Sequence, residues 1–215
     1  MLGLVVTQYN RGFYTERCVE SLLSAELKDV MLVLVDDAST DPKAKSLLTH
    51  PIFSSVIVNR RNLGVNLSLK SGWDFCAKKC DVLMNLDNDA IVAPDFVERV
   101  LALLDIFPNR VVSGFNCNSV NERGQGRHPV VNETEYYIEK RRIGGINTCF
   151  TTQTYRKYIV RNLRPRMYNW DSRSTMNMSA RGLHPVVTKP SCIQHIGEIS
   201  SLGHNFNIDY ATDFV

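Results

Sequence analysis

Short apolar runs alternate with amphipathic stretches along the first half of the chain. Runs rich in β-branched residues predict buried strands, and apolar residues spaced three or four apart predict helices. The predicted strands are 2–7, 30–35, 56–58 and 82–86, and the predicted helices are 14–27, a short one from Pro42, 67–77 and 94–104. Asp41 and Pro42 suit the N-cap and first position of the short helix. This alternating order with short links predicts right-handed crossovers and a mostly parallel sheet.

The pattern is looser beyond residue 110. The sequence predicts an edge strand at 111–115, a surface loop at 121–132, a strand after Gly144-Gly145, a helical stretch at 152–160, a helix at about 172–181, a short strand at 185–188 and an irregular tail after His195. Gly182 suits the position that stops the second of these helices. The chain is therefore predicted to be a single α/β domain over 1–215, with a regular half (1–110) and a smaller mixed half (111–215).

Composition is that of an ordinary globular protein, with 44% hydrophobic and 22% charged residues. No apolar run approaches the roughly 18 residues of a membrane span. Met1 leads directly into the first predicted strand and leaves no room for a signal peptide. The cysteines show neither CxxC spacing nor the density of a disulfide scaffold; they are Cys18, Cys76, Cys80, Cys117, Cys149 and Cys192. We therefore expect a cytoplasmic, reduced protein.

Charge is unevenly distributed along the chain. Residues 1–119 carry 12 basic and 14 acidic side chains, whereas residues 120–190 carry 13 basic and 5 acidic ones. The basic side chains of this middle region include Lys140, Arg141, Arg142, Arg156, Lys157, Arg161, Arg164 and Arg166. They either form a solvated basic face or favour an anionic partner.

Two carboxylates stand at the end of the strand predicted at 82–86. Asp87 and Asp89 are separated by Asn88, so in an extended segment they point to the same side. Carboxylates held this close repel each other unless a cation lies between them. Oxygen ligands at the rim of a parallel sheet suit Mg²⁺ or Mn²⁺ with substrate phosphates completing the coordination.

The ends of two earlier strands also carry polar side chains. Tyr9 could stack on a nucleobase, and Asp37 could accept a hydrogen bond from a base N–H, although an aspartate in this place is more often a helix cap. Lys70, or Arg60 or Arg61, could neutralise phosphate. Because parallel strands end at one edge, these residues jointly predict a site for a nucleotide diphosphate and a metal.

Other nucleotide sites fit the sequence less well. No G-x-G-x-x-G follows the first strand and no G-x-x-x-x-G-K-[ST] occurs, which argues against dinucleotide and P-loop sites. An aspartyl-phosphatase motif would stand on the first strand, whereas Asp87 follows the fourth. A nucleotidyltransferase would need a glycine-rich basic loop after the first strand, and residues 8–12 do not form one.

Several of these motifs, in kind, order and spacing, resemble the family 2 glycosyltransferases of GT-A fold. They are Thr7-Gln8-Tyr9-Asn10-Arg11, Val35-Asp36-Asp37-Ala38-Ser39-Thr40-Asp41, Asn62-Leu63-Gly64 with Gly72, Asp87-Asn88-Asp89, Gly144-Gly145, Trp170-Asp171 with Gly182, and Gln194-His195-Ile196-Gly197. The resemblance spans residues 1–200 and implies a GT-A type Rossmann-like domain. Residues 1–110 would then bind the nucleotide sugar, and residues 111–215 would bind the acceptor.

The resemblance also implies a role for each site residue. Thr7 and Tyr9 would line the base pocket, and Asp37 would bind the base, often uracil. Asp87 would reach the ribose or the metal, and Asp89 would bind the metal. The remaining predicted residues are Arg11, Lys70 and Asn88 for the donor, Asp171 as general base, and His195 as a further metal ligand. His204 is a rival to His195, and a buried or capping imidazole is the alternative interpretation of His195.

Two positions depart from the family pattern. Trp170 replaces the first acid of the usual Glu-Asp pair, and Leu69-Lys70 replaces the usual Arg-Asn. Together the motifs predict a Mn²⁺- or Mg²⁺-dependent, inverting glycosyltransferase that uses a nucleotide-diphospho-sugar, with UDP the expected nucleotide. The acceptor is expected to be a saccharide, bound by residues 117–145 and 160–170. The alternatives are a nucleic-acid acceptor, such as a modified DNA base, and a catalytically silent module that binds sugar nucleotides or glycans.

Overall fold

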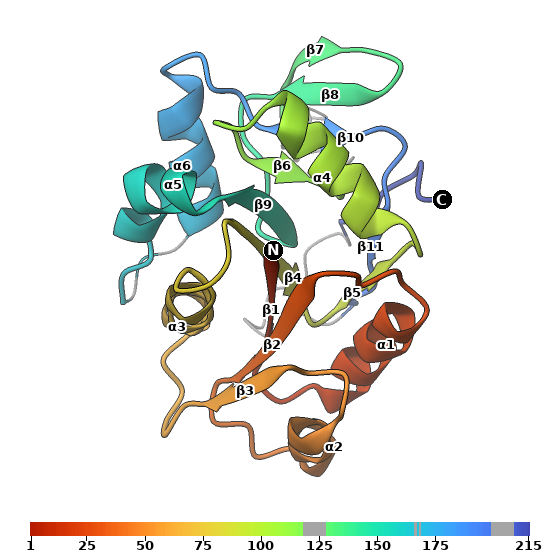
Figure 1. Ribbon diagram of the computed structural model, residues 1–215, viewed down its shortest axis with the longest axis vertical. Coiled ribbons are helices and arrows are strands. Elements are labelled where there is room, and N and C mark those ends of the chain that lie inside the picture. The colour runs from red at the N-terminus through yellow and green to blue at the C-terminus, as the bar shows by residue number, and fades with distance from the viewer. Residues whose placement is uncertain (118–127, 166, 168, 199–208) are drawn as a thin grey trace.

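A nine-stranded mixed sheet forms the centre of the computed structural model, which describes residues 1–117, 128–165, 167, 169–198 and 209–215. The strands are β1 (Leu2–Gln8), β2 (Val30–Asp36), β3 (Ser55–Val58), β4 (Val82–Asp87), β6 (Val112–Ser113), β7 (Val130–Glu133), β8 (Tyr137–Lys140), β9 (Asn147–Thr151) and β10 (Val186–Thr188). They lie in the order β3-β2-β1-β4-β9-β6-β10-β8-β7 (Figure 1). A separate antiparallel pair consists of β5 (Ala90–Val92) and β11 (Ile193–His195).

The predicted fold class is confirmed. Strands β3, β2, β1 and β4 are all parallel, as the alternating pattern of the first half requires. The second half is mixed, because β9 runs antiparallel to both β4 and β6, and β10 is parallel to β6 but antiparallel to β8.

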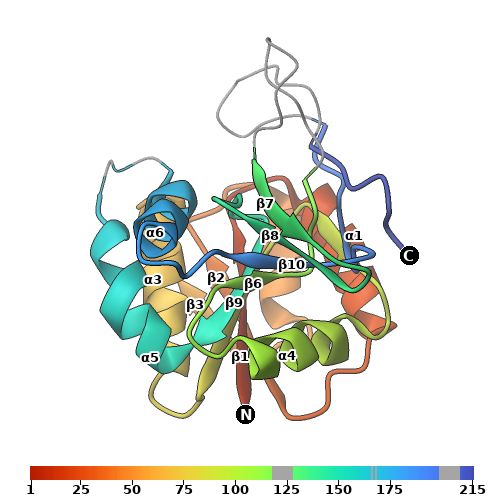
Figure 2. The same cartoon turned by 90° about the horizontal axis from the view of Figure 1, so that it is seen from above.

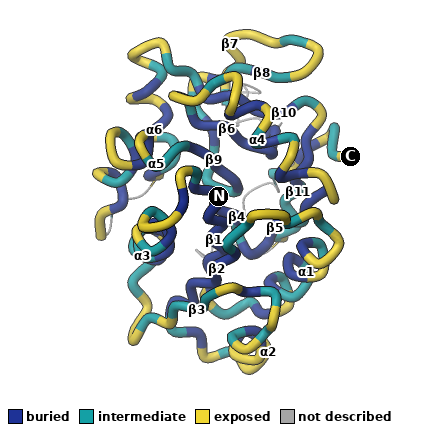
Figure 3. Tube along the Cα trace, in the orientation of Figure 1, coloured by how far each residue is buried: buried dark blue, intermediate teal, exposed yellow. Residues whose placement is uncertain are grey.

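Helices cover both faces of the sheet (Figures 1 and 2). They are α1 (Gly12–Leu23), α2 (Pro42–Ser46), α3 (Val65–Cys76), α4 (Phe96–Ile106), α5 (Thr152–Thr154) and α6 (Trp170–Ser179), with a π-helical turn η2 (Tyr155–Ile159) and two 3₁₀ turns, η1 (Leu47–Thr49) and η3 (Val160–Asn162). On β1, Leu4 and Val6 join the core under α1 and α4, and Val5 joins the core under α3 and α6. Burial on both faces explains the continuous apolar strands of the sequence, which appear as the dark centre of Figure 3.

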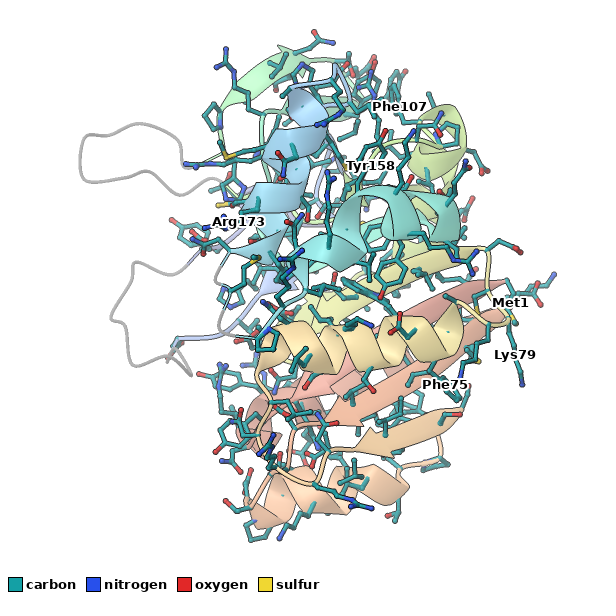
Figure 4. All side chains as sticks on the ribbon, turned by 90° about the vertical axis from the view of Figure 1, so that its left-hand side faces the viewer. Met1, Phe75, Lys79, Phe107, Tyr158 and Arg173 are labelled. Carbon is teal, nitrogen blue, oxygen red and sulfur yellow. The ribbon has the colours of Figure 1, made fainter. Side chains whose placement is uncertain are left out.

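An aromatic cluster fixes the position of α6. The Trp73 ring contacts Phe150, Tyr155 and Trp170 edge to face, at centroid distances of 5.1, 5.8 and 5.3 Å. In Figure 4, α6, the helical stretch of α5 and η2, and α3 lie one above the other, and the labelled Phe75, Tyr158 and Arg173 lie on the outer side of these helices. Edge-to-face pairs add stability beyond the area they bury, so the start of α6 is firmly placed against α3.

Capping explains where α2 begins and where α6 ends. The Asp41 carboxylate accepts hydrogen bonds from the backbone N–H groups of Lys43 and Ala44, as expected for the N-cap of α2. At the end of α6, Leu183 N–H donates to the Met178 carbonyl and Gly182 adopts φ +75°, which completes a Schellman motif.

Two local predictions for the second half are wrong, and one strand was not predicted. Residues 111–115 do not form an edge strand, because β6 lies between β9 and β10 inside the sheet. Residues 130–132 belong to β7, which pairs with β8 in place of the expected loop. The sequence did not predict strand β11, which ends at His195. Residues 121–127 of the expected loop, together with Arg166 and His204, lie outside the described residues.

Throughout the described part of the chain, every helix is too short or too polar to cross a lipid bilayer.

Candidate active site

The ends of three parallel strands meet at one edge of the sheet. Thr7 on β1 is paired in register with Val35 on β2 and with Asp87 on β4, and Gln8 is paired with Asp36. The backbone N–H of Asp37 then donates to the Gln8 carbonyl and continues this alignment. Thr7, Asp37 and Asp87 therefore lie at adjacent strand ends along one edge of the sheet. Open α/β sheets bind their ligands at this edge.

The small sheet of β5 and β11 brings His195 to Asp89. His195 is paired with Ala90, and Ile196 N–H donates to the Asp89 carbonyl at 2.8 Å. In this register His195 Nε2 lies 3.4 Å from Asp89 Oδ2. A Cβ atom on Gly197 would overlap both side chains, so glycine is the residue that this packing permits. The Gln-His-Ile-Gly motif is thus explained by the approach of its backbone to Asp89.

Arg11 supplies a second positive group at Asp89. Its Nη2 lies 2.7 Å from Asp89 Oδ2, and its guanidinium group stacks on the Tyr14 ring at 4.5 Å. Both Asn10 and Arg11 adopt left-handed backbone conformations, with φ 52° and 56°. Asn10 is held there because its side-chain oxygen accepts hydrogen bonds from the backbone of Thr40 and Asp41. Such strained residues concentrate at functional sites, where their surroundings fix them.

Electrostatics separates the two acids of the Asp87-Asn88-Asp89 turn. Burial raises the pKa of Asp87 well above its usual range, and the neighbouring charge of Asp89 raises it further. Burial also raises the pKa of Asp89, but His195 and Arg11 offset this and the net pKa is lowered. Burial lowers the pKa of His195, and its contact with Asp89 more than reverses this. Asp89 is therefore the ionised member, whereas Asp87 needs a further positive charge to ionise.

Asp171 stands in the first turn of α6, across from Asp87. Its charge raises the pKa of Asp87, and its own pKa is raised chiefly by burial, although hydrogen bonds from backbone N–H groups oppose this. Gly145 lies beside both residues: a Cβ atom there would be 3.4 Å from Asp171 Oδ2 and from the Trp170 ring, which is an ordinary contact distance. Trp170 is buried in the aromatic cluster, so the residue that departs from the family pattern anchors the helix that carries Asp171.

Asn85 is a site-supporting residue that the sequence did not reveal. It is fully buried on β4, its amide donates to the Gly145 carbonyl at 2.6 Å, and its side-chain oxygen accepts from Thr148 N–H at 3.0 Å. It therefore joins the strand of Asp87 to the backbone beside Asp171. An asparagine inside an apolar strand was the available signal, because buried polar groups need partners.

The other predicted donor residues have varied surroundings. Tyr9 is 42% exposed at the end of β1, where a base could reach its ring. The Asp37 carboxylate already accepts three hydrogen bonds at 2.8 Å, from the Asn59 amide and from the backbone N–H groups of Leu63 and Gly64, and so shapes the loop before α3. The donor-binding roles of both residues stay predictions.

Two further predicted donor residues make contacts inside the protein. The Asn88 amide donates to Thr15 Oγ1 at 2.9 Å, which ties the turn to α1. Lys70 forms an ion pair with Asp74 one turn further along α3, and Asp74 also accepts a hydrogen bond from Tyr155. The donor-binding roles of Asn88 and Lys70 stay predictions.

The side chains of Asp89 and His195 together offer ligand atoms that suit a divalent cation. The two side chains are largely buried and their nearest atoms are 3.4 Å apart. His195 Nδ1 lies 2.9 Å from the Asp209 carbonyl, so Nδ1 carries a proton and Nε2 can offer a lone pair. One imidazole nitrogen beside carboxylate oxygens fits Mn²⁺ better than Mg²⁺, which prefers oxygen alone. Among the described residues, no three His, Cys, Asp or Glu side chains form a complete cage, so the coordination would need substrate oxygens.

Comparison with known proteins identifies the chain. The sequence profile described as "Glycosyl transferase family 2" matches residues 4–164. The chain belongs to glycosyl transferase family 2. Membership of this family confirms the predicted resemblance, and it makes the protein a glycosyltransferase.

Relatives of this family 2 glycosyltransferase differ in the share of their length that it spans. The amylovoran biosynthesis glycosyltransferase AmsE of Erwinia amylovora is 23% identical over 204 residues, which cover 91% of this chain and 76% of that protein. An uncharacterized glycosyltransferase of Haemophilus influenzae is 29% identical over 153 residues, 68% of this chain and 51% of that protein. Chondroitin synthase of Escherichia coli is 27% identical over 103 residues, 47% of this chain and 15% of that protein.

A solved structure supports the fold of this family 2 glycosyltransferase. The crystal structure of GalNAc-T7 with UDP, GalNAc and Mn²⁺ superposes with a TM-score of 0.74 over 92% of this chain and 44% of that one. Because sequence identity is 15%, this likeness establishes the GT-A fold alone, and UDP, GalNAc and Mn²⁺ are ligands of GalNAc-T7.

Proposed function

We propose that this glycosyltransferase is Mn²⁺-dependent, takes its sugar from a UDP-sugar and transfers it with inversion to a saccharide hydroxyl. One observation carries the proposal. The pairing of β5 with β11 places His195 Nε2 3.4 Å from Asp89, at the sheet edge where the donor residues of β1 and β2 end. The binding of UDP and Mn²⁺ by GalNAc-T7, which shares the fold, supports the same choice of donor and metal.

The donor would lie along the ends of β1, β2 and β4. Thr7, Tyr9 and Asp37 would hold the base, and Asp87 would reach the ribose or the metal. Asp89 and His195 would hold the cation, which would stabilise the charge that develops on the leaving pyrophosphate. Arg11 is already within reach of Asp89, and it provides a second counter-charge for the phosphates.

Asp171 would serve as the general base. The raised pKa of Asp171 makes its carboxylate a stronger base than an exposed aspartate, which suits removal of a proton from an acceptor hydroxyl. The hydroxyl oxygen then attacks the anomeric carbon as the bond to the nucleoside diphosphate breaks on the opposite side. A single displacement of this kind inverts the anomeric configuration and needs no protein nucleophile.

The acceptor would be bound by the second half of the chain, through 117–145 and 160–170. The basic residues of this region are not one uniform surface. Lys140 is buried and donates to Asn116 and Cys117, whereas Arg156, Lys157, Arg161 and Arg164 are exposed. Arg156 and Lys157 line a pocket with Asp81 at the start of β4, the end of the strand opposite to Asp87. Within the exposed group, Arg161 and Arg164 are therefore the candidates for contact with an anionic saccharide. A cytoplasmic location is part of the proposal, and the six buried free cysteines support it.

A donor screen tests the proposal directly. Melting temperatures would be measured with Mn²⁺ and each of several nucleotide sugars, and the best ligand would then be assayed for transfer and for hydrolysis. We expect a UDP-sugar to give the largest increase, EDTA to abolish turnover, and the product to have the inverted anomer. Turnover that persists in EDTA would refute metal dependence, and a retained anomer would refute the single displacement. DNA binding that weakens steeply with salt would instead favour a nucleic-acid acceptor.

A further inference from the structure

The C-terminal segment 209–215 lies behind His195 and is held at several points. We call it the strap. The strap crosses the β10–β11 connection near the end of the chain that is marked C in Figure 1. Val215 N–H donates to the Ser191 carbonyl at 3.2 Å, and Ala211 is 3% exposed in the core under α1 and α4. The strap is thus packed as a part of the fold.

One strap atom contacts the imidazole of His195. The Asp209 carbonyl lies 2.9 Å from Nδ1, and because a carbonyl only accepts, Nδ1 must be the protonated nitrogen. The opposite nitrogen, Nε2, is the one that faces Asp89. This contact therefore keeps a proton on Nδ1 and fixes the orientation of the ring, so that Nε2 is the nitrogen open to a cation.

The position of the Asp209 carbonyl depends on two anchors further along the strap. The first is an amide pair: Gln194 Nε2 donates to the Ala211 carbonyl at 2.8 Å, and Ala211 N–H donates to Gln194 Oε1 at 2.9 Å. Since Gln194 precedes His195 directly, this pair keeps the strap in register with β11.

The second anchor is Asp213. Its carboxylate accepts hydrogen bonds from Ser191 Oγ at 2.9 Å and from the Asn116 amide at 3.5 Å. Asn116 in turn accepts from the buried ammonium of Lys140 at 2.5 Å. The strap is therefore tied to β8 and to the segment after β6, at a distance from the metal ligands.

We propose that the strap is a positioning element of the metal site, which holds His195 in the Nδ1–H tautomer with its Nε2 lone pair directed at the cation. The inference rests on the metal dependence proposed above. Outer contacts of this kind are worth about 10- to 100-fold in metal affinity. The strap thus makes the C-terminal residues contributors to Mn²⁺ affinity although they contribute no ligand.

The test compares Asp213→Ala with Asp105→Ala, which removes an exposed acid of α4 and changes the net charge equally. The dissociation constant of Mn²⁺ would be measured by electron paramagnetic resonance in the presence of UDP. The hydrogen bond made by the Nδ1–H group of His195 would be followed by ¹H–¹⁵N NMR without metal. We expect Mn²⁺ binding about tenfold weaker in Asp213→Ala only, together with loss of the hydrogen-bonded Nδ1–H signal of His195.

Unchanged Mn²⁺ affinity and an unchanged His195 signature in a folded Asp213→Ala protein would overturn the inference, even if its melting temperature fell. If Asp213→Ala does not fold, Asp213→Asn and Gln194→Glu provide milder breaks of the two anchors and carry the same expectation. Failure of the wild-type protein to bind Mn²⁺ with UDP would overturn the proposed metal dependence itself. Mn²⁺ binding by the wild type with equal binding by the strap variants would overturn the strap alone.

Discussion

The two halves of this glycosyltransferase place their site residues by different means. In the first half, Thr7 and Asp87 stand at the ends of long parallel strands that are buried on both faces. In the second half, Asp171 and His195 stand on a short helix and a three-residue strand, which depend on individual polar contacts made by Asn85 and the strap. Apolar packing tolerates many substitutions, whereas a buried hydrogen bond needs both partners. A single substitution among these supporting residues should therefore lower activity more in the second half than in the first.

The largest effect is expected where the two halves meet, at Asp89. Asp89→Asn removes the charge that both Arg11 and His195 contact, so transfer should fall by about 10⁴-fold, since a bound metal contributes several kcal/mol to transition-state stabilisation. Turnover with saturating Mn²⁺ would be measured beside Asp81→Asn, which alters a highly exposed acid. A loss smaller than tenfold would show that the cation is held elsewhere.

Asp171→Asn should separate chemistry from binding. Without a general base, kcat should fall by about 10²- to 10³-fold, while the affinities for UDP and Mn²⁺ stay close to those of the wild type. Calorimetric titration with UDP and Mn²⁺ checks the second part. Loss of UDP binding in the folded variant would mean that Asp171 belongs to the donor site.

The pH profile provides a second test of Asp171. Asp171 acts as a base only when ionised, and burial raises its pKa above the ordinary value of 3.8. Activity is therefore present above this raised pKa, and kcat/KM should fall tenfold per unit as pH falls through it. The residual activity of Asp171→Asn should lack this inflection. An unchanged inflection in the variant would assign it to another group.

A pair of substitutions with smaller effects should distinguish support by hydrogen bonds from support by apolar packing. Asn85→Ala leaves the Gly145 carbonyl and Thr148 N–H without their partner, so it should cost about 1–3 kcal/mol of stability and lower kcat about tenfold. Leu34→Ala, in the apolar core of β2, should cost about 2–5 kcal/mol and leave kcat of the folded enzyme nearly unchanged. Denaturant unfolding and kcat would be measured on both. Equal kcat values would contradict the contrast between the halves.

The same contrast explains what could be predicted from the sequence. Hydrophobic periodicity located β4 to within one residue, because a strand buried on both faces is apolar throughout. It could not locate β11, since Ile193, Gln194 and His195 are too few to show a period. The interior position of β6 depends on which strands pair with it, and that information lies far along the chain.

The candidate site shows a similar division. The Asp87-Asn88-Asp89 turn could be recognised from the chemistry of neighbouring carboxylates alone. Asp171 and His195 were reached only through the resemblance to family 2, because a single aspartate and a single histidine carry no pattern. The contact between Arg11 and Asp89 and the strap behind His195 had no signal in the sequence, since both arise from tertiary packing.

The pairing of β5 with β11 also has a consequence for the order of folding. Asp89 and His195 are joined across roughly a hundred residues of chain, and closing a loop of that length costs about 4 kcal/mol of entropy. Contacts of such long range form late, after local βα units have collapsed. The first half of the chain can therefore be in place before Asp89 and His195 meet. A cation shared by Asp89 and His195 would then act as a non-covalent cross-link, which stabilises the finished chain and not its folding intermediates.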